Sequence, residues 1–184
     1  MTAPLNVLLA GFGGQGVLFA GKLIAEAGLI EGREVSWLPS YGPEMRGGTA
    51  NCSVCLSDEP IGSPLVLEPD VLVAMNQPSL DKFFGDVAPG GTVLVDSTMV
   101  PRVPERDDVT IVRVPATQRA EDAGLKGLAN VILVGTLLGE LGFCDAGSLD
   151  AAIVKSVPPK RSHLLEPNRK ALEIGMEQSG SCHL

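Results

Sequence analysis

The stretch NVLLAGFGGQG, residues 6–16, decides the fold of this chain. Its first five residues, NVLLA, are almost all apolar, as in a central parallel strand that is buried on both faces. Gly11, Gly13 and Gly16 follow with the spacing G-x-G-x-x-G, and apolar residues then recur at helical spacing over residues 17–30. A glycine-rich turn between such a strand and such a helix predicts the beginning of a Rossmann-like domain.

Outward from this stretch, strand-like and helix-like segments alternate along the chain. The alternation predicts the α/β class, with a single Rossmann-like domain whose mostly parallel sheet is flanked by helices on both faces. We expect this domain to span residues 1–178 and residues 179–184 to form a flexible tail. The predicted strands are residues 33–38, 49–56, 71–75, 92–95 and 109–114, and the predicted helices are residues 79–87, 116–124, 128–141, 149–157 and a last helix from 161 or 167 to 176.

Two local signals refine these predictions. Pro39 has no N–H to donate to a central ladder, so we expect the chain to leave the sheet there and a loop to begin at Ser40. Ser79 stands at the start of a helical segment, where a hydroxyl side chain is a favourable N-cap, so we predict that it caps this helix.

Composition narrows the classes of function. The chain has 184 residues, is 45% hydrophobic and carries a formal net charge of −8. These values suit one well-filled core and argue against nucleic-acid binding, which requires Lys and Arg to displace counterions. The N-terminus has no basic segment before its short apolar run, unlike a signal peptide, and the apolar stretch at residues 128–138 is well below the roughly 20 residues of a membrane span. We therefore expect a cytoplasmic protein that binds neither nucleic acid nor a membrane.

The four cysteines are expected to be reduced thiols. Cys52 and Cys55 form a C-x-x-C, but they lie in a strand-like run, where positions three apart point to opposite faces of a sheet. Joint metal binding by this pair is therefore disfavoured, and with Cys144 and Cys182 isolated we expect no iron–sulfur cluster held by this chain alone.

The glycine loop itself has two interpretations. Backbone N–H groups at a helix N-terminus, with the positive end of the helix dipole behind them, form a site for phosphate. In that interpretation Gly11 permits a tight turn, Gly13 lets the backbone approach the phosphate, and Gly16 lets the helix pack on the strand. In the other interpretation the loop is only a structural turn. A nicotinamide dehydrogenase would place an acidic residue at the end of the second strand, where this chain has WLPS at residues 37–40 and Glu34 only at the opposite end, so NAD binding is disfavoured.

Several motifs resemble those of a known family. GFGGQGV at residues 11–17 and SYGPEMRGGTANC at residues 40–52 resemble the gamma subunits of 2-oxoacid:ferredoxin oxidoreductases, and IGSP at 61–64 and AMNQPSLDKF at 74–83 are similar to the same family. The resemblance covers roughly residues 6–176, and the 40–52 motif is far more specific than G-x-G-x-x-G. The intact form of that motif looks more like the 2-oxoglutarate or branched-chain branch than the pyruvate branch, and 2-oxoglutarate is the expected substrate.

The resemblance implies a subunit of a complex that oxidatively decarboxylates a 2-oxoacid to an acyl-CoA and reduces ferredoxin. It implies thiamine diphosphate with Mg²⁺ and iron–sulfur clusters in partner subunits, and contact of this chain with CoA is our hypothesis. The implied partners are catalytic alpha and beta subunits, a ferredoxin-like delta subunit and ferredoxin. The chain alone is expected to be inactive, and we assign it no catalytic residue and no metal ligand.

The candidate cofactor-binding residues lie in the two loops. Arg46 is the strong anion-binding side chain among them, because a guanidinium can hold phosphate or carboxylate through two hydrogen bonds. Our hypothesis is that both loops lie at the carboxyl edge of the sheet, where open α/β folds bind ligands, and bind CoA or close over the thiamine site of the catalytic subunits. The candidate residues are Gly11, Gly13, Gly14, Gln15, Gly16, Ser40, Tyr41, Gly42, Arg46, Gly47, Gly48, Thr49 and Asn51.

Two features outside the loops have more than one interpretation. Gly135-x-x-x-Gly139, in the apolar helix, suits burial within this fold, which we favour, or close approach by a helix of another subunit. A basic stretch near the C-terminus forms either a solvated face or a contact with a subunit or a phosphate. It comprises Lys155, Lys160, Arg161, Arg169 and Lys170, opposed only by Glu166.

Two competing functions are considered beside the leading one. The first is a stand-alone Rossmann-type nucleotide-binding oxidoreductase, and the second is a non-enzymatic assembly subunit in which the glycine loop is only a turn.

Overall fold

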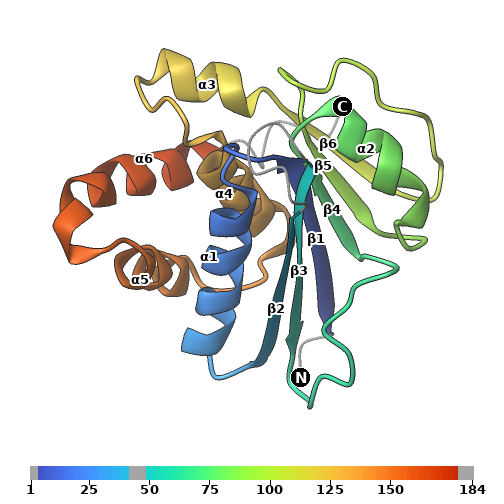
Figure 1. Cartoon of the computed structure of the whole chain (residues 1–184), viewed down its shortest axis with the longest axis horizontal. Coiled ribbons are helices and arrows are strands. Elements are labelled where there is room, and N and C mark those ends of the chain that lie inside the picture. The colour runs from blue at the N-terminus through green and yellow to red at the C-terminus, as the bar shows by residue number, and fades with distance from the viewer. Residues whose placement is uncertain (1–3, 42–48, 178–184) are drawn as a thin grey trace.

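The structure is a computed structural model, and it describes residues 4–41 and 49–177. The described chain forms one six-stranded sheet with helices packed against it (Figure 1). The strands are β1 (Leu5–Phe12), β2 (Glu34–Tyr41), β3 (Thr49–Ser57), β4 (Val71–Ala74), β5 (Thr92–Asp96) and β6 (Thr110–Val114). The helices are α1 (Val17–Ile30), α2 (Gln77–Phe83), α3 (Ala116–Asp122), α4 (Ala129–Leu141), α5 (Ala146–Ser156) and α6 (Leu165–Met176), with short 3-10 turns at Phe84–Asp86 and Pro159–Leu164.

The prediction of an α/β domain with a mostly parallel sheet is confirmed. The strand order is β2-β3-β1-β4-β5-β6, and β1, β4, β5 and β6 are parallel neighbours. β3 is the exception, because it lies between β1 and β2 and pairs antiparallel with both. The short connection from β2 to β3 explains this direction, since parallel pairing would require a crossover of a dozen residues or more.

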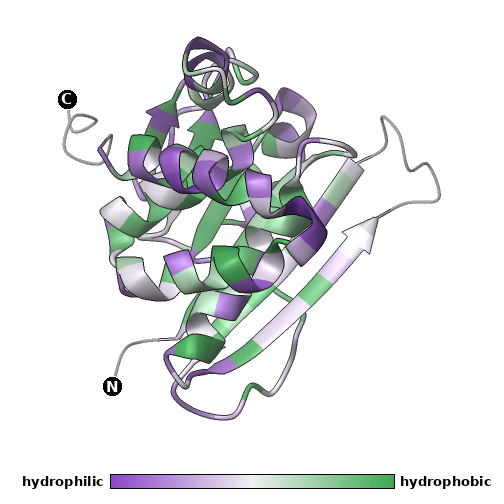
Figure 2. Ribbon diagram, turned by 90° about the vertical axis from the view of Figure 1, so that its left-hand side faces the viewer, coloured by the Kyte–Doolittle hydropathy of each residue, from purple (hydrophilic) through white to green (hydrophobic). Residues whose placement is uncertain are grey.

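The expectation that the chain leaves the sheet at Pro39 is wrong. β2 continues to Tyr41, and Pro39 pairs with Cys52 of β3. The prediction assumed a central strand, whereas β2 lies at the edge of the sheet, and an edge strand tolerates a proline whose missing N–H faces away from the ladder. Figure 2 shows the mixed hydropathy of this edge strand beside the apolar central strands.

Helices cover both faces of the sheet, as predicted, but unevenly. The larger core packs α1, α4, α5 and α6 against one face, and it includes Leu9, Leu23 and Leu133. The smaller core lies on the opposite face, where Leu80 and Phe84, from α2 and the 3-10 turn that follows it, pack on β1, β4 and β5 (Figure 1). α5 begins at Ala146 rather than residue 149, and α6 begins at Leu165, between the two predicted starts. None of the helices in the described part of the chain is long and apolar enough to cross a membrane.

The C-x-x-C cysteines point to opposite faces of β3, as predicted. The Cys52 thiol lies under α1 and donates to the carbonyl of Val17 at 3.6 Å, whereas the Cys55 thiol donates to Ser63 at 3.9 Å. Burial raises the pKa of Cys52 to about 12, and burial also raises the pKa of Cys55. Both thiols are therefore held in the protonated, unreactive form at neutral pH.

Gly135 of the apolar helix α4 lies in a contact within this chain, opposite Gly175 of α6. Gly135 lies against the backbone of α6 at Leu172, and Gly175 lies against the backbone of α4, where a Cβ would come within 2.8 Å of the Thr136 nitrogen. The Thr136 hydroxyl bonds to Gly175 O at 3.2 Å. Gly139 is exposed and takes no part in this crossing. The favoured interpretation, burial within the fold, therefore holds for Gly135.

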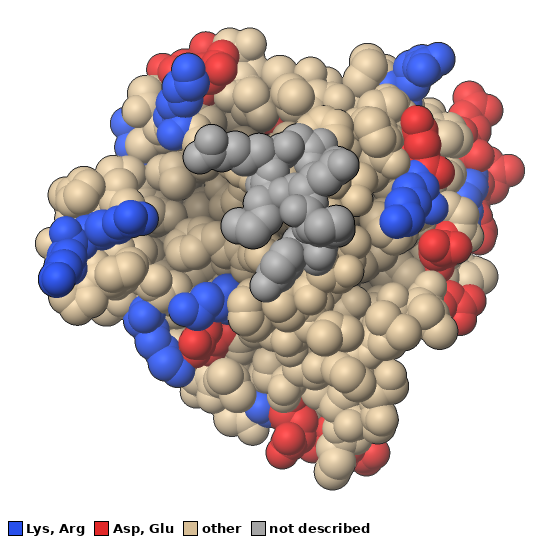
Figure 3. All heavy atoms as spheres, in the orientation of Figure 1, with Lys and Arg blue, Asp and Glu red and all other residues tan. Residues whose placement is uncertain are grey.

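Acidic side chains oppose part of the C-terminal basic stretch. Arg169 bonds to Asp150 at 2.6 Å and to Glu166 at 2.7 Å, and hydrogen bonds to these carboxylates raise the pKa of Arg169 above its ordinary value. Lys155 pairs with Glu26 of α1 at 2.6 Å. The sequence count overlooked Glu26 and Asp150 because both lie on other helices, Glu26 on α1 and Asp150 on α5, 19 residues from Arg169. On the face drawn in Figure 3, basic and acidic side chains are intermingled around the rim.

Candidate functional site

The glycine loop joins the carboxyl end of β1 to α1. β1 runs through Gly11 to Phe12, and a turn closes with a hydrogen bond from Gln15 N to Phe12 O at 3.1 Å. Gly11 therefore lies in the strand, paired with Ala50 of β3, and does not form the tight turn that the motif predicted. A Cβ on Gly11 would lie 2.8 Å from both Gln15 Oε1 and Val17 Cγ2, so its role is to leave room for these two side chains.

Gly16 has a different neighbour from the one that the motif predicted. It is the N-cap of α1 and has φ of 75°, a left-handed conformation that favours glycine. A Cβ there would lie 2.5 Å from the side-chain nitrogen of Asn130, which donates to Gly16 O at 3.0 Å. The missing side chain thus admits the first turn of α4, rather than packing α1 on β1.

The Gln15 side chain fixes the loop to the neighbouring strand. Its Oε1 accepts from Phe12 N at 2.6 Å and from Asn76 Nδ2 at 3.0 Å, and its Nε2 donates to Met75 O at 2.9 Å. Asn76 also accepts from Ser79 N at 2.9 Å and is the N-cap of α2. The predicted cap at Ser79 is wrong, because the helix begins two residues earlier and Ser79 supplies the N–H that is capped.

The loop retains the properties of an anion site. No side chain caps the N-terminus of α1, and the first N–H groups of a helix have no partner within the helix. Gly14 is exposed, has φ of 100° and has open space on the side where a Cβ would stand. Partial positive charge at the start of a helix of 14 residues favours a phosphate or carboxylate.

The described ends of the second loop lie beside the glycine loop, as expected. Ser40 pairs with Asn51, Tyr41 pairs with Ala50, and Thr49 pairs with Phe12, immediately before the glycine turn. Both loops therefore leave the same edge of the sheet. The remaining candidates in this loop, which are Gly42, Arg46, Gly47 and Gly48, lie outside the described residues.

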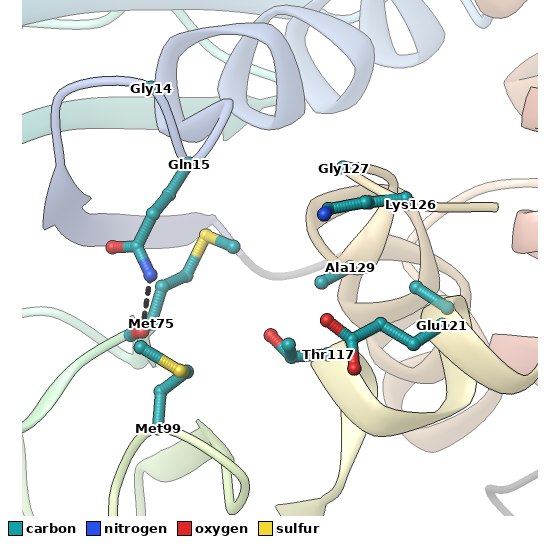
Figure 4. A pocket seen from close by; sticks show the side chains of 10 residues that line it. Gly14, Gln15, Met75, Met99, Thr117, Glu121, Lys126, Gly127 and Ala129 are labelled. Atoms are coloured by element: carbon teal, nitrogen blue, oxygen red, sulfur yellow. Dashed lines mark hydrogen bonds between the residues drawn. The ribbon is translucent and has the colours of Figure 1, made fainter.

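A cavity of about 260 Å³ opens at this edge, next to the glycine loop. Gly14 and Gln15 form part of one side, and α3 with the connection to α4 forms the other (Figure 4). The sequence analysis did not select most of its lining, because no motif marks it. Gly14, Gln15 and Met75 alone lay in motifs that it had quoted. The lining residues that it missed as site residues are Met75, Met99, Thr117, Ala120, Glu121, Lys126, Gly127 and Ala129.

Asp96 holds the α3 side of the cavity in place. It lies at the end of β5 and is fully buried. Its carboxylate accepts from the Thr117 hydroxyl at 2.5 Å, from Thr117 N at 3.2 Å and from Thr98 N at 3.1 Å. Buried carboxylates require such partners, and here they tie β5 to the start of α3. An acidic residue directly after a buried strand was the sequence signal for this position.

The topology adds an argument against a nicotinamide site. In a dinucleotide-binding fold the second strand is parallel to the first and next to it, and its end carries the acid that binds ribose. Here β3 occupies that place in the opposite direction, and the end of β2 lies one strand farther away. Glu34, at the start of β2, is at the other end of the strand from the glycine loop.

Comparison with known proteins identifies relatives along almost the whole chain. A family model described as pyruvate ferredoxin/flavodoxin oxidoreductase matches residues 6–178. The 2-oxoglutarate synthase subunit KorC of Methanocaldococcus jannaschii is 40% identical over 157 residues, covering 83% of each chain. The ketoisovalerate oxidoreductase subunit VorA of Methanothermobacter marburgensis is 43% identical over 175 residues, which are 94% of this chain but 36% of that protein. The chain thus spans about a third of the length of this relative.

Solved structures share the fold. The gamma subunit of a keto/oxoacid ferredoxin oxidoreductase from Geobacter sulfurreducens superposes with a TM-score of 0.83 at 29% identity, covering 97% of this chain and 99% of that one. A 2-oxoglutarate:ferredoxin oxidoreductase from Magnetococcus marinus, solved with 2-oxoglutarate, coenzyme A and succinyl-CoA bound, has a TM-score of 0.88 over 98% of this chain and 32% of its own; at 22% identity this likeness concerns the fold alone. Together with the family model, these findings establish that the chain belongs to the pyruvate ferredoxin/flavodoxin oxidoreductase family and has the fold of its gamma subunits.

Proposed function

We propose that this chain is the gamma subunit of a cytoplasmic 2-oxoacid:ferredoxin oxidoreductase and that it contributes to CoA binding and to assembly of the complex. The complex converts a 2-oxoacid and CoA into an acyl-CoA and CO₂, and electrons pass to ferredoxin. The name of the KorC relative supports 2-oxoglutarate as the first substrate to test, and the name of the VorA relative supports a branched-chain 2-oxoacid as the second.

The observation that carries the CoA proposal is the cavity beside the glycine loop. CoA combines phosphates with an apolar and amide-bearing arm, and its thiol receives the acyl group. Lys126 and the start of α1 suit the phosphates, while Met75, Met99 and Ala129 supply apolar surface.

The catalytic cofactors are proposed to reside in partner subunits. Among the described residues there is no group of three His, Cys, Asp or Glu side chains that could hold a metal ion. The proposal assigns thiamine diphosphate with Mg²⁺ and iron–sulfur clusters to the alpha, beta and ferredoxin-like delta subunits, and this chain is proposed to be inactive alone. The greater length of the VorA relative supports an association of this domain with further polypeptide.

The test is an assay of the native complex for CoA-dependent reduction of ferredoxin with 2-oxoglutarate, 2-oxoisovalerate and pyruvate. Lys126→Ala and Arg46→Ala should each raise the KM for CoA about tenfold, since a charge-assisted hydrogen bond contributes about 1.5–3 kcal/mol. Lys160→Ala is the matched control, because Lys160 is exposed and does not line the cavity. If Lys126→Ala and Arg46→Ala both leave the KM for CoA unchanged, the proposal that this chain contributes to CoA binding is contradicted.

The contacts of Gln15 favour a second candidate function. Because its side chain satisfies groups of the loop within the protein, the loop could serve assembly alone. In that case Lys126→Ala and Arg46→Ala would leave the KM for CoA unchanged, while variants that loosen the loop would reduce recovery of the complex. A stand-alone nucleotide-binding oxidoreductase would instead bind NAD(H) as the isolated chain, which calorimetry detects directly.

A further inference from the structure

The α3 side of the cavity presents hydrogen-bond acceptors. A threonine hydroxyl has one proton to donate and two lone pairs that accept. The proton of Thr117 points to Asp96, at a distance of 2.5 Å between the oxygens. Asp96 is fully buried behind Thr117 and takes the hydroxyl proton. The Thr117 oxygen can therefore only accept a hydrogen bond from a ligand.

The backbone donors on this side are also engaged. Thr117 N donates to Asp96 at 3.2 Å, and Gln118 N donates to the Thr98 hydroxyl at 3.2 Å. Glu121, one turn farther along α3, adds a carboxylate to the same side of the cavity (Figure 4). An anionic group placed here would meet acceptors and negative charge, whereas an N–H group would find partners.

The other sides of the cavity complement this one. In Figure 4 Lys126 extends its ammonium group into the cavity from the connection between α3 and α4, on the same side as Glu121. The glycine loop at Gly14 lies across from α3, and the N-terminus of α1 favours phosphate there. The thioethers of Met75 and Met99 form an apolar, polarisable surface between these regions. Sulfur makes favourable contacts with aromatic rings. The cavity thus combines a surface for a flat ring, an acceptor pair on the α3 side and the N-terminus of α1 on the opposite side.

We propose that the acceptor pair of Thr117 and Glu121 recognises the amino group of the adenine ring of CoA, and that Asp96 sets this preference by fixing the direction of the Thr117 hydroxyl. The proposal rests on the proposed CoA-binding function and adds the group that the cavity selects. Thr117 is the specificity-determining residue, and Asp96 is a positioning residue that acts through it.

The test measures ligand affinity by calorimetry on the assembled complex without 2-oxoacid. The ligands are CoA, its hypoxanthine analogue, in which a carbonyl replaces the amino group, and 3′-phospho-ADP, which lacks the pantetheine arm. Thr117→Val should weaken CoA and 3′-phospho-ADP roughly 5- to 12-fold, the effect of one hydrogen bond, and leave the hypoxanthine analogue nearly unchanged. Thr117→Ser is the matched control that keeps the hydroxyl and should retain the discrimination.

Asp96→Asn supplies a second, opposite prediction. An asparagine amide can donate to the Thr117 oxygen, which turns the hydroxyl proton toward the cavity. The preference should then shift toward the hypoxanthine analogue, by a similar factor, while a merely structural role of Asp96 would weaken all ligands alike. If this variant does not fold, the Thr117 pair still decides the proposal.

Three results would overturn the inference. Equal weakening of CoA and its hypoxanthine analogue by Thr117→Val would show that Thr117 does not recognise the amino group. If Thr117→Val weakened the binding of CoA but not of 3′-phospho-ADP, the N–H group that Thr117 accepts would belong to a pantetheine amide and not to adenine. An unchanged affinity for every ligand would exclude Thr117 from the site. Failure of the wild-type complex to bind CoA through this chain, judged by Lys126→Ala having no effect, would instead contradict the proposed function.

Discussion

Replacement of Gly175 by alanine tests the close contact between α6 and α4. A Cβ at this position would fall on the carbonyl oxygen of Ile132 and would lie 2.8 Å from Thr136 N and 2.9 Å from the Cα of Gly135. All three obstacles are backbone atoms of α4, so no side-chain rotation relieves the overlap. α6 must therefore move away from α4, and the hydrogen bond between Thr136 and Gly175 must lengthen.

The expected magnitude follows from three contributions. Overpacking in a well-packed core costs about 1–3 kcal/mol, and the lost hydrogen bond costs about 0.5–1.5 kcal/mol. The better helix propensity of alanine returns up to about 1 kcal/mol. The free energy of unfolding should therefore fall by about 0.5–3.5 kcal/mol, and Tm should fall by roughly 1–14 °C for a chain of this length.

Urea unfolding followed by circular dichroism measures this change. Gly147→Ala is the matched control, since Gly147 also lies in a helix but has open space where a Cβ would stand, and its stability should be unchanged or slightly higher. Gly135→Ala probes the same contact from α4 and should cost a similar amount, and the double variant should cost less than the sum of the two because both relieve one overlap. A Gly175→Ala protein as stable as the wild type would refute the close crossing of α4 and α6.

Three further predictions concern the loop, the thiols and a surface ion pair. Gln15→Leu removes three hydrogen bonds of the glycine loop and should lower the free energy of unfolding by about 1–3 kcal/mol. Gln15→Glu keeps the acceptor and should lower it by less. Equal stability of Gln15→Leu and wild type in urea would contradict the role given to this side chain. In a Cys182→Ser background, Cys52 should resist iodoacetamide at pH 8 until denaturant is added. Because burial raises its pKa to about 12 from 9.0, its contribution to stability should be complete below pH 9 and decline between pH 9 and 12; rapid labelling of the native protein would count against this. Asp150→Asn removes an exposed partner of Arg169 and should change the free energy of unfolding by less than about 1 kcal/mol. At high salt the substitution should have little effect, because salt screens the ion pair. A larger loss in thermal unfolding would mean that the pair is more than a surface contact.

The start of the fold was predictable because its signals are local. An apolar run, three glycines and a helical pattern lie within 25 residues of each other, and the observed β1 and α1 reproduce the predicted segments with β1 extended at both ends. Local patterning also placed β4, β5, β6 and the main helices. Each of these elements is determined mostly by its own sequence and by burial of its apolar face.

The predictions for Pro39, Gly11 and Gly16 were wrong because residues distant in the sequence determine the structure at these positions. Pro39 signals a break only in a central strand, and the edge position of β2 depends on β3 lying between it and β1. Gly11 and Gly16 have the spacing of a phosphate loop, but their missing side chains accommodate Val17 and Asn130, and the second of these comes from α4. No pattern within a short window contains that information.

The candidate site was only partly predictable for the same reason. The two loops can be recognised in the sequence by their glycine content, and the strand register brings their described ends together. The opposite side of the cavity comes from α3 and the start of α4, where Thr117, Glu121 and Lys126 belong to no motif. Asp96 and Thr117 are 21 residues apart and form their contact only when β5 and β6 lie side by side.

The antiparallel pairing of β2 with β3 has a consequence for how the 40–52 motif can diversify. Eight paired positions from Glu34 to Tyr41 hold the two strands together without help from the connection between them, so that β-hairpin is a self-contained module. The register of these two strands does not depend on the number of residues between Tyr41 and Thr49, and the entropic cost of doubling a loop is only about 0.6 kcal/mol. Changes between residues 42 and 48 should therefore alter ligand binding more than they alter stability.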